Sequence, residues 1–178
     1  LHYEIYQMLG EGSYGCVYTC SLADSQDTEP SEFAVKVINA RRLAIITGRP
    51  VQDVVPRMFR EVEALVALGA HPRIVTLYKS FFSLRTCKLY LVYELIRGGD
   101  LFNAMVRRRR PFTETEAARV LAQLADAVLF GHRKGIAHRD IKLENCLLDD
   151  ESAITVKLCD YGQAAMLESG VIAKTLAT

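Results

Sequence analysis

The sequence has little of what marks membrane, secreted or nucleic-acid-binding proteins. Its apolar runs fall short of the roughly 18 residues that span a bilayer, and residues 1–4 lack the charged and apolar regions of a secretion signal. The 22 Lys and Arg residues nearly balance the 21 Asp and Glu residues, so the net charge is only +1. A charge this small creates no field that would require a nucleic acid or an acidic membrane as partner. We therefore expect no membrane segment and no nucleic-acid partner.

Cysteine is scarce and irregularly spaced. The five cysteines form an odd number, without the close pairs that build zinc sites or disulfide frameworks. They are Cys16, Cys20, Cys87, Cys146 and Cys159. Because free thiols persist in reducing compartments, we expect a cytoplasmic or nuclear setting.

Half of the residues are hydrophobic, and in the first half of the chain they form short runs separated by polar turns. This pattern predicts antiparallel strands. The runs are residues 16–20, 33–38, 74–78 and 89–93. The polar residues 21–32 have too little apolar content for a core and predict a hairpin loop.

One helix interrupts these strands. Pro56 is tolerated in a first helical turn, apolar residues recur at helical spacing after it, and Gly69 supplies a left-handed stop. The helix is predicted over residues 57–68. Residues 41–55 are compatible with a loop, a short extra turn or an extension of this helix.

The second half of the chain is predicted to be mainly helical. Asp100 is a candidate cap for a helix over residues 101–109, and Thr113 with Glu116 forms a capping box for a longer one. Apolar residues surround most of that longer helix, residues 113–129, which predicts burial on nearly all sides.

Two more strands are predicted beyond these helices. Residues 146–148 and 155–158 are short apolar runs on either side of an acidic turn at residues 149–152. Together with the earlier strands and helices, they make the chain an α+β protein.

Gly10, Gly12 and Gly15 lie between two segments that resemble strands. Without side chains, such a turn lets backbone N–H groups approach phosphate oxygens. An ordinary glycine hairpin explains the same spacing. Val17 and Ala34 are small apolar residues suited to sandwich a flat base, although strand core explains either of them alone.

Lys36 stands between Val35 and Val37 in an apolar strand, where a buried ammonium needs a partner. Glu61 on the predicted helix can reach it and hold it against phosphates. The alternative is that both side chains lie on the surface, as most lysines and glutamates do.

Residues 138–145 are the most specific string. Phosphoryl transfer to a hydroxyl needs one carboxylate to orient the nucleophile and accept its proton, and cations to hold the phosphate. Asp140 and Lys142 suit these roles, while Asn145 and Asp160 offer the hard oxygen ligands that Mg²⁺ prefers. The alternative is a polar loop capped by Asp and Asn.

With residues 10–17, 34–36, 138–145 and 160–162 in this order, the chain resembles the eukaryotic protein kinase family, serine/threonine type. It is similar to the calmodulin-dependent and AMP-activated groups. The resemblance implies a bilobal α+β fold with ATP and Mg²⁺ as cofactors. Its β-rich N-lobe, residues 1–95 with a five-stranded sheet and one main helix, is complete, and its helical C-lobe, residues 96–178, is incomplete.

The resemblance also assigns roles to residues. Asp140, Lys142, Lys36 and Glu61 are the implied catalytic residues, and Asn145 and Asp160 the metal ligands. Tyr93 is the gatekeeper side chain at the nucleotide pocket, and Asp100 lies near the ribose. The implied nucleotide contacts are Leu9, Gly10, Glu11, Gly12, Ser13, Tyr14, Gly15, Val17, Ala34, Lys36, Tyr93, Glu94, Ile96, Asp100 and Leu147.

The implied function is transfer of the ATP γ-phosphate to serine or threonine hydroxyls of a protein substrate. Asp100 and Glu144 suggest a preference for basic residues upstream of the target hydroxyl, with a ribose contact and a surface acid as the alternative. The competing function is a noncatalytic kinase-like module that binds nucleotide or a partner. The oligomeric state is left open.

The sequence departs from the resembled family at three points. Tyr161 replaces the usual phenylalanine, and Gly131 replaces the usual leucine in a helix. The chain also stops at Thr178, before the family's Ala-Pro-Glu motif and later helices, so we expect low stability and weak activity for this span alone. The four arginines at residues 107–110 are interpreted as a solvated helix end rather than a docking patch.

Overall fold

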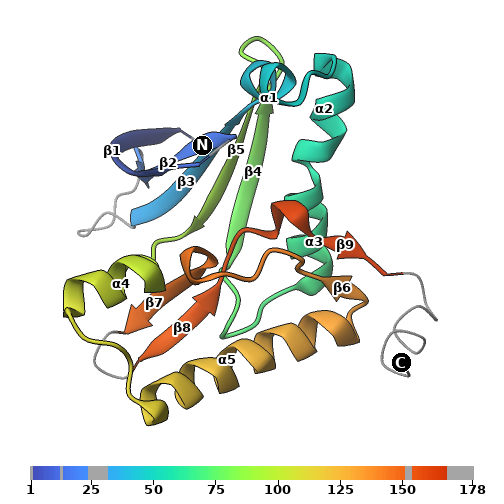
Figure 1. The fold of residues 1–178 in the computed structure, drawn as a ribbon. Coiled ribbons are helices and arrows are strands. Elements are labelled where there is room, and N and C mark those ends of the chain that lie inside the picture. The colour runs from blue at the N-terminus through green and yellow to red at the C-terminus, as the bar shows by residue number, and fades with distance from the viewer. Residues whose placement is uncertain (1, 13, 24–31, 151–153, 168–178) are drawn as a thin grey trace. The chain divides into compact units, whose positions relative to one another are not determined.

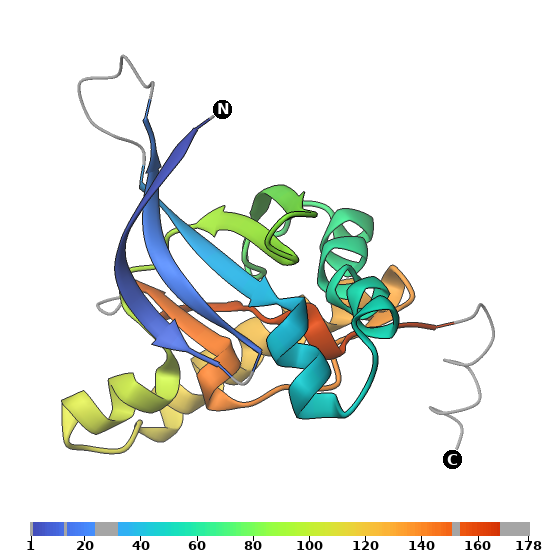
Figure 2. The same cartoon turned by 90° about the horizontal axis from the view of Figure 1, so that it is seen from above.

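Five antiparallel strands form the sheet in the first part of the chain (Figure 1). The computed structural model describes residues 2–12, 14–23, 32–150 and 154–167. The strands are β1 (Tyr3–Glu11), β2 (Gly15–Leu22), β3 (Glu32–Asn39), β4 (Leu77–Ser83) and β5 (Lys88–Glu94). Their order across the sheet is β1-β2-β3-β5-β4, and Figure 2 shows β1, β2 and β3 side by side. The antiparallel strands are thus confirmed. Residues 24–31 of the predicted hairpin loop lie outside the described residues.

The strand predicted over residues 74–78 was placed too early, because β4 begins at Leu77. Ile74 instead forms a bridge to Leu158, the last residue of β8 (Thr155–Leu158). The Val75 N–H also donates to the Leu158 carbonyl, at 3.0 Å. The backbone at residues 74–75 is therefore paired with β8 and does not join the sheet.

Alternation along β3 separates the core from the candidate site. Val35 is buried in a cluster with Cys20 and Val92, and it pairs across the sheet with Val92. Since successive strand residues point to opposite faces, Ala34 and Lys36 lie on the other face of β3. The core packing thus fixes the face on which the Lys36 ammonium is presented.

Three helices follow β3 in place of the single predicted helix. They are α1 (Ala40–Thr47), α2 (Val51–Met58) and α3 (Arg60–Leu68). The Asn39 side chain caps α1 by accepting from the N–H groups of Arg41 and Arg42. Residues 41–55, left open by the sequence, are therefore largely helical.

The predicted start of the helix at residue 57 is wrong. Pro56 lies inside α2, which ends at Met58, and the N–H of the capping residue Phe59 donates to the Pro56 carbonyl at 3.3 Å. Proline lacks the N–H that would donate to the carbonyl four residues earlier, so it weakens the turn before it and does not explain the end of α2. The stop at Gly69 is confirmed, because α3 ends before this residue and its φ is +72°.

Both predicted caps in the second half are confirmed. The Asp100 side chain accepts from the Asn103 N–H at the start of α4 (Leu101–Arg108). Thr113 and Glu116 form both arms of the capping box of α5 (Glu114–Arg133), which runs four residues past the predicted end. Within the described part of the chain, no helix combines the length and apolar character needed to cross a membrane.

The prediction that the longer helix is buried on nearly all sides is wrong for the described residues. Val120, Ala127 and Gly131 are buried, whereas Leu121 and Leu129 are 65% and 49% exposed. One side of α5 packs against β8 and β6 (Ile136–Ala137), as Figure 1 shows for β8. The described residues thus leave about half of the Leu129 side chain, and more of Leu121, uncovered.

A short hairpin carries the chain past α5. Strand β7 (Cys146–Asp150) pairs with β8, as predicted, and residues 151–153 of the acidic turn lie outside the described residues. The Gln123 side chain of α5 donates to the Ile154 carbonyl at 2.8 Å and accepts from the Val156 N–H at 3.1 Å. These two bonds hold the hairpin on α5.

The chain divides into two compact units. Residues 1–62 and 76–95 form the first, and residues 63–75 and 96–178 the second, so the boundary falls inside α3. The division into domains at residues 1–95 and 96–178 stays a prediction. The predicted site residues therefore lie in two groups, one in each unit.

Candidate active site

The glycine-rich segment is a tight β-hairpin rather than an open loop. Gly10 lies within β1 opposite Val17, Gly15 begins β2, and the Gly12 N–H donates to the Gly15 carbonyl at 2.8 Å. Only residues 12–14 connect the strands, and Ser13 lies outside the described residues. The predicted loop between strands is therefore shorter than expected. Leu9 and Tyr14 flank it with exposed side chains.

The glycines of this hairpin have different structural requirements. A Cβ on Gly15 would lie 2.1 Å from the Val37 carbonyl oxygen, so this position needs glycine to pack against β3. A Cβ on Gly10 would meet no described atom within 4 Å. Packing therefore explains Gly15, whereas Gly10 leaves open space beside the strand that carries Val17.

Replacement of Gly15 with alanine should destabilise the protein by about 3 kcal/mol, because backbone must shift to relieve the overpacking. The matched change Gly10→Ala should alter the free energy of unfolding by no more than about 0.5 kcal/mol. Denaturant unfolding of both variants measures the difference. Equal changes in the free energy of unfolding for the two variants would contradict a packing requirement that is specific to Gly15.

Lys36 and Glu61 form the predicted ion pair. The Lys36 Nζ donates to the Glu61 Oε2 at 2.7 Å, and the two side chains are 20% and 3% exposed. Glu61 is the second residue of α3, so the bond joins this helix to β3. The surface alternative is excluded, because the carboxylate is buried. A charge buried this deeply requires such a partner.

Tyr93 is a second donor to Glu61 that the sequence did not reveal. Its hydroxyl donates to the Glu61 Oε1 at 2.7 Å. Tyr93 lies opposite Ala34 in the sheet, and Lys36 lies opposite Val17. Because cross-strand partners point to the same face, all four side chains share one face of the sheet. The available sequence signal was the tyrosine that ends the apolar run 89–93, because a tyrosine hydroxyl must find a partner when it is buried.

The end of β5 is held in place by Glu94. Its N–H donates to the Thr76 carbonyl at 3.1 Å, and its side-chain Oε1 accepts from the Thr76 N–H at 2.7 Å. This pair of bonds fixes the backbone that leads to the half-buried Ile96. Glu94 is therefore fixed at the strand end, and the nucleotide contacts of Glu94 and Ile96 stay predictions.

The second group centres on Asp140. The Lys142 Nζ donates to its Oδ2 at 2.8 Å, and the Asn145 Nδ2 donates to the same oxygen at 2.9 Å. Asn145 also donates to the Asp140 carbonyl at 2.8 Å. The Asp140 carboxylate raises the pKa of Lys142, chiefly through the hydrogen bond. Within the described residues, both of these donors use Oδ2, which leaves Oδ1 able to accept from a hydroxyl.

His138 fixes the backbone of this loop. Its Nδ1 accepts from the Asp140 N–H at 3.2 Å, and its Nε2 lies 2.9 Å from the Cys159 carbonyl oxygen. With Nδ1 accepting, the ring carries its proton on Nε2 and donates to Cys159. His138 is buried, so these two bonds hold Asp140 against the segment before Asp160.

The β7–β8 hairpin brings the two predicted metal ligands to the same end. Cys146 pairs with Leu158, and the Cys159 N–H donates to the Asn145 carbonyl at 2.9 Å. Asp160 follows directly, with a left-handed backbone (φ 60°). Antiparallel pairing thus places residues 145 and 160 at adjacent chain ends.

Asp100 and Leu147 are also neighbours, because an antiparallel bridge joins them. The Asp100 Oδ1 accepts from the Asn103 N–H at 2.8 Å, and its Oδ2 accepts from the Asn103 Nδ2 at 2.7 Å. Oδ1 thus caps the backbone of α4, while Oδ2 binds the Asn103 side chain of the same helix. The predicted ribose contact of Asp100 stays a prediction.

The arginine run is largely engaged within the second unit. Arg107 donates to the Gly98 carbonyl, and Arg108 and Arg110 both bind the Glu116 carboxylate. The hydrogen bonds from Arg110 and Thr113 hold the pKa of Glu116 well below its usual range. These contacts fix the turn between α4 and α5, and they favour the helix-end interpretation over a docking patch.

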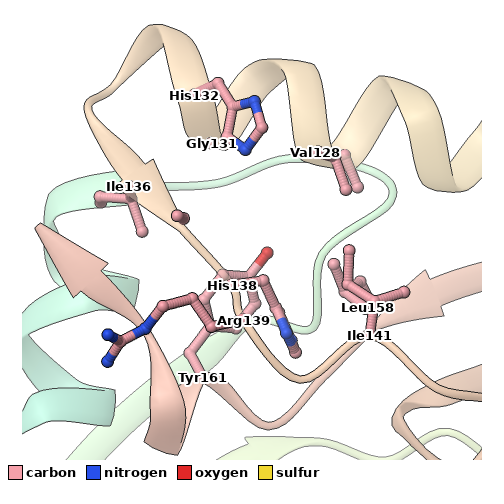
Figure 3. Close-up of a pocket in the computed structure, with 11 residues that line it drawn as sticks. Val128, Gly131, His132, Ile136, His138, Arg139, Ile141, Leu158 and Tyr161 are labelled. Atoms are coloured by element: carbon pink, nitrogen blue, oxygen red, sulfur yellow. The ribbon is translucent and has the colours of Figure 1, made fainter. Parts of the chain in front are cut away.

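The two departures within the fold, Gly131 and Tyr161, line the same pocket (Figure 3). The pocket has a volume of about 150 Å³ and lies between α5 and the residues around His138. The Tyr161 ring meets the His138 ring edge-on at 4.5 Å, and its hydroxyl points toward α5. Burial raises the pKa of Tyr161. Since none of the predicted nucleotide contacts lines it, this pocket is not the predicted nucleotide site.

Comparisons with known proteins agree with this arrangement. Residues 3–178 match the family described as Protein kinase domain. The chain is 36% identical to CBL-interacting serine/threonine-protein kinase 7 of Arabidopsis thaliana, over 93% of this chain and 35% of that protein. It is 38% identical to MAP kinase-interacting serine/threonine-protein kinase 2 of Xenopus laevis, over 89% of this chain and 31% of that protein.

A third relative is ribosomal protein S6 kinase alpha-2 of Homo sapiens, 35% identical over 94% of this chain and 20% of that protein. The chain thus spans about a third or less of the length of these relatives. The predicted α+β fold with a β-rich N-lobe is confirmed. Because the match covers nearly every residue, the chain belongs to the protein kinase domain family.

Proposed function

We propose that the protein transfers the γ-phosphate of ATP to serine or threonine hydroxyls of protein substrates. The observation that carries this proposal is the Asp140 carboxylate, held on Oδ2 by Lys142 and Asn145. The names of the relatives, which are serine/threonine-protein kinases, support the same reaction.

In the proposed reaction, Asp140 orients the substrate hydroxyl and accepts its proton as the hydroxyl oxygen bonds to the γ-phosphorus. The bond between that phosphorus and the bridging oxygen breaks, and ADP leaves with the electron pair. Lys142, which is hydrogen-bonded to Asp140, supplies positive charge near the transferred group. Lys36, which Glu61 orients, supplies positive charge at the phosphates of the nucleotide.

The predicted magnesium ligands have the right donor chemistry. The Asn145 amide nitrogen is turned toward Asp140, so its amide oxygen points away from that carboxylate. Asn145 and Asp160 would hold Mg²⁺ through oxygens, which this cation prefers. When bound, the cation neutralises charge on the phosphates.

For substrate choice, we propose a preference for basic residues upstream of the target hydroxyl. Glu144 supports it, because its carboxylate is exposed next to the Asp140 loop. Asp100 supports it less, since both of its carboxylate oxygens already accept hydrogen bonds from Asn103. We also propose a cytoplasmic or nuclear location, which the five free thiols support.

The test is phosphorylation of a peptide array by the full-length protein with labelled ATP and Mg²⁺. We expect label on serine and threonine peptides, most strongly on those with upstream arginines. Nucleotide binding without any transfer would favour the noncatalytic module instead. Label that is independent of upstream charge would remove only the substrate preference.

A further inference from the structure

Glu61 accepts a hydrogen bond on each of its carboxylate oxygens, from residues on two different strands. Lys36 of β3 binds Oε2, and Tyr93 of β5 binds Oε1, both at 2.7 Å. We propose that Tyr93 is a positioning residue and that its hydroxyl acts as a latch, which holds Glu61 and the first residues of α3 to the sheet. Its effect on phosphoryl transfer rests on the proposed function.

The bond is strong because neither partner faces water. Tyr93 is 7% exposed and Glu61 is 2% exposed. A buried carboxylate that loses a donor is left with an acceptor that water cannot satisfy. Hydrogen bonds to charged acceptors are also stronger than neutral ones. The hydroxyl of Tyr93 thus does more than fill space beside Ala34.

The latch differs in kind from the ion pair. Lys36 is 20% exposed on its side chain and carries the charge that phosphates attract. Tyr93 is neutral and only 7% exposed, so it lacks the charge that attracts phosphates to Lys36. Because Tyr93 holds one oxygen of Glu61, the other oxygen stays in place to orient Lys36 toward the phosphates. The ion pair is thereby pre-organised for the nucleotide.

The test is a double-mutant cycle on kcat/KM in the full-length enzyme. Tyr93→Phe removes only the hydroxyl, and we expect it to lower kcat/KM about tenfold, as loss of a hydrogen bond to a charged group does. In a Glu61→Gln background, where the acceptor charge is gone, the same change should cost less than about twofold. A role limited to packing would give equal losses in both backgrounds and would overturn the latch.

Tyr90→Phe is the matched control. Tyr90 lies on the same strand, and within the described residues its hydroxyl makes no hydrogen bond. This variant should keep the activity of the unmodified enzyme. A loss equal to that of Tyr93→Phe would also overturn the latch, because removal of any hydroxyl from β5 would then have the same result.

Denaturant unfolding of the four proteins of the cycle separates the latch from the proposed function. These proteins are the unmodified protein, Tyr93→Phe, Glu61→Gln and the double variant. We expect the two substitutions to be coupled by a factor of about ten in the unfolding equilibrium constant, a result that does not depend on phosphoryl transfer. Coupling without any transfer by the unmodified protein would retain the latch and reject the proposed function. Transfer with no coupling in either measurement would retain the function and reject the latch.

Discussion

Replacement of Asp140 with asparagine should lower kcat for phosphoryl transfer about a thousandfold, within the range that a general base contributes. The reason is chemical rather than structural. The asparagine oxygen can still accept from Lys142 and Asn145, which bind a single oxygen of Asp140. It cannot take a proton from the substrate hydroxyl. The KM for ATP should therefore change little, and steady-state kinetics with a peptide substrate measures both constants.

Asp149→Asn is the control for this change. Asp149 is an exposed carboxylate on β7 in the same unit, so the chemistry of the substitution is identical. We expect normal kcat from this variant. If Asp140→Asn retained kcat within tenfold of the unmodified enzyme, Asp140 would not be the group that accepts the proton.

Local signals made much of the fold predictable. The Asp100 cap and the capping box of Thr113 and Glu116 were identified from spacing alone, because each satisfies backbone N–H groups within one turn. The β7–β8 hairpin was predicted for a similar reason, since it joins neighbouring segments. Such features depend on few residues that lie close in sequence.

The errors arose where the residues of a segment are compatible with more than one structure. Residues 74–75 have the apolar character of a strand, yet their backbone pairs with Leu158, more than eighty residues later in the chain. Around Pro56, the sequence allows either a helix start or a late helix residue. Because α2 begins at Val51, Pro56 is a late residue of this helix. The pairing of residues 74–75 depends on a distant segment, whereas the outcome at Pro56 depends on a helix that starts five residues before it.

The candidate site shows the same division. The ion pair of Lys36 and Glu61 was predictable from the sequence, because a lysine in an apolar strand needs a counter-ion. The Tyr93 contact was missed because it depends on the β3–β5 register, which sets Tyr93 opposite Ala34. Sequence pattern identified the charges of the site, whereas the tertiary structure supplied the neutral donor.

Replacement of Lys36 with methionine should damage both stability and activity, and a second substitution can separate the two. Removal of one partner of a buried ion pair destabilises a protein by about 3 kcal/mol or more, because the other charge is left without its partner. In this variant Glu61 is the charge left without its partner, and its side chain is only 3% exposed. The loss of Lys36 should also lower kcat by roughly a hundredfold or more, as loss of a donor to developing charge does.

The double variant Lys36→Met with Glu61→Leu removes the buried charge as well. Because well-packed apolar residues can replace a buried ion pair, the double variant should recover part of the free energy of unfolding. The recovery stays incomplete because the buried Tyr93 hydroxyl loses its Glu61 acceptor. Its phosphoryl transfer should stay as low as that of Lys36→Met, since no ammonium is restored. Denaturant unfolding and peptide phosphorylation measure the two properties, and Lys79→Met on the exposed side of β4 is the control. Recovery of activity together with stability would show that Lys36 serves the fold alone, whereas stability without activity assigns the Lys36 ammonium to the reaction.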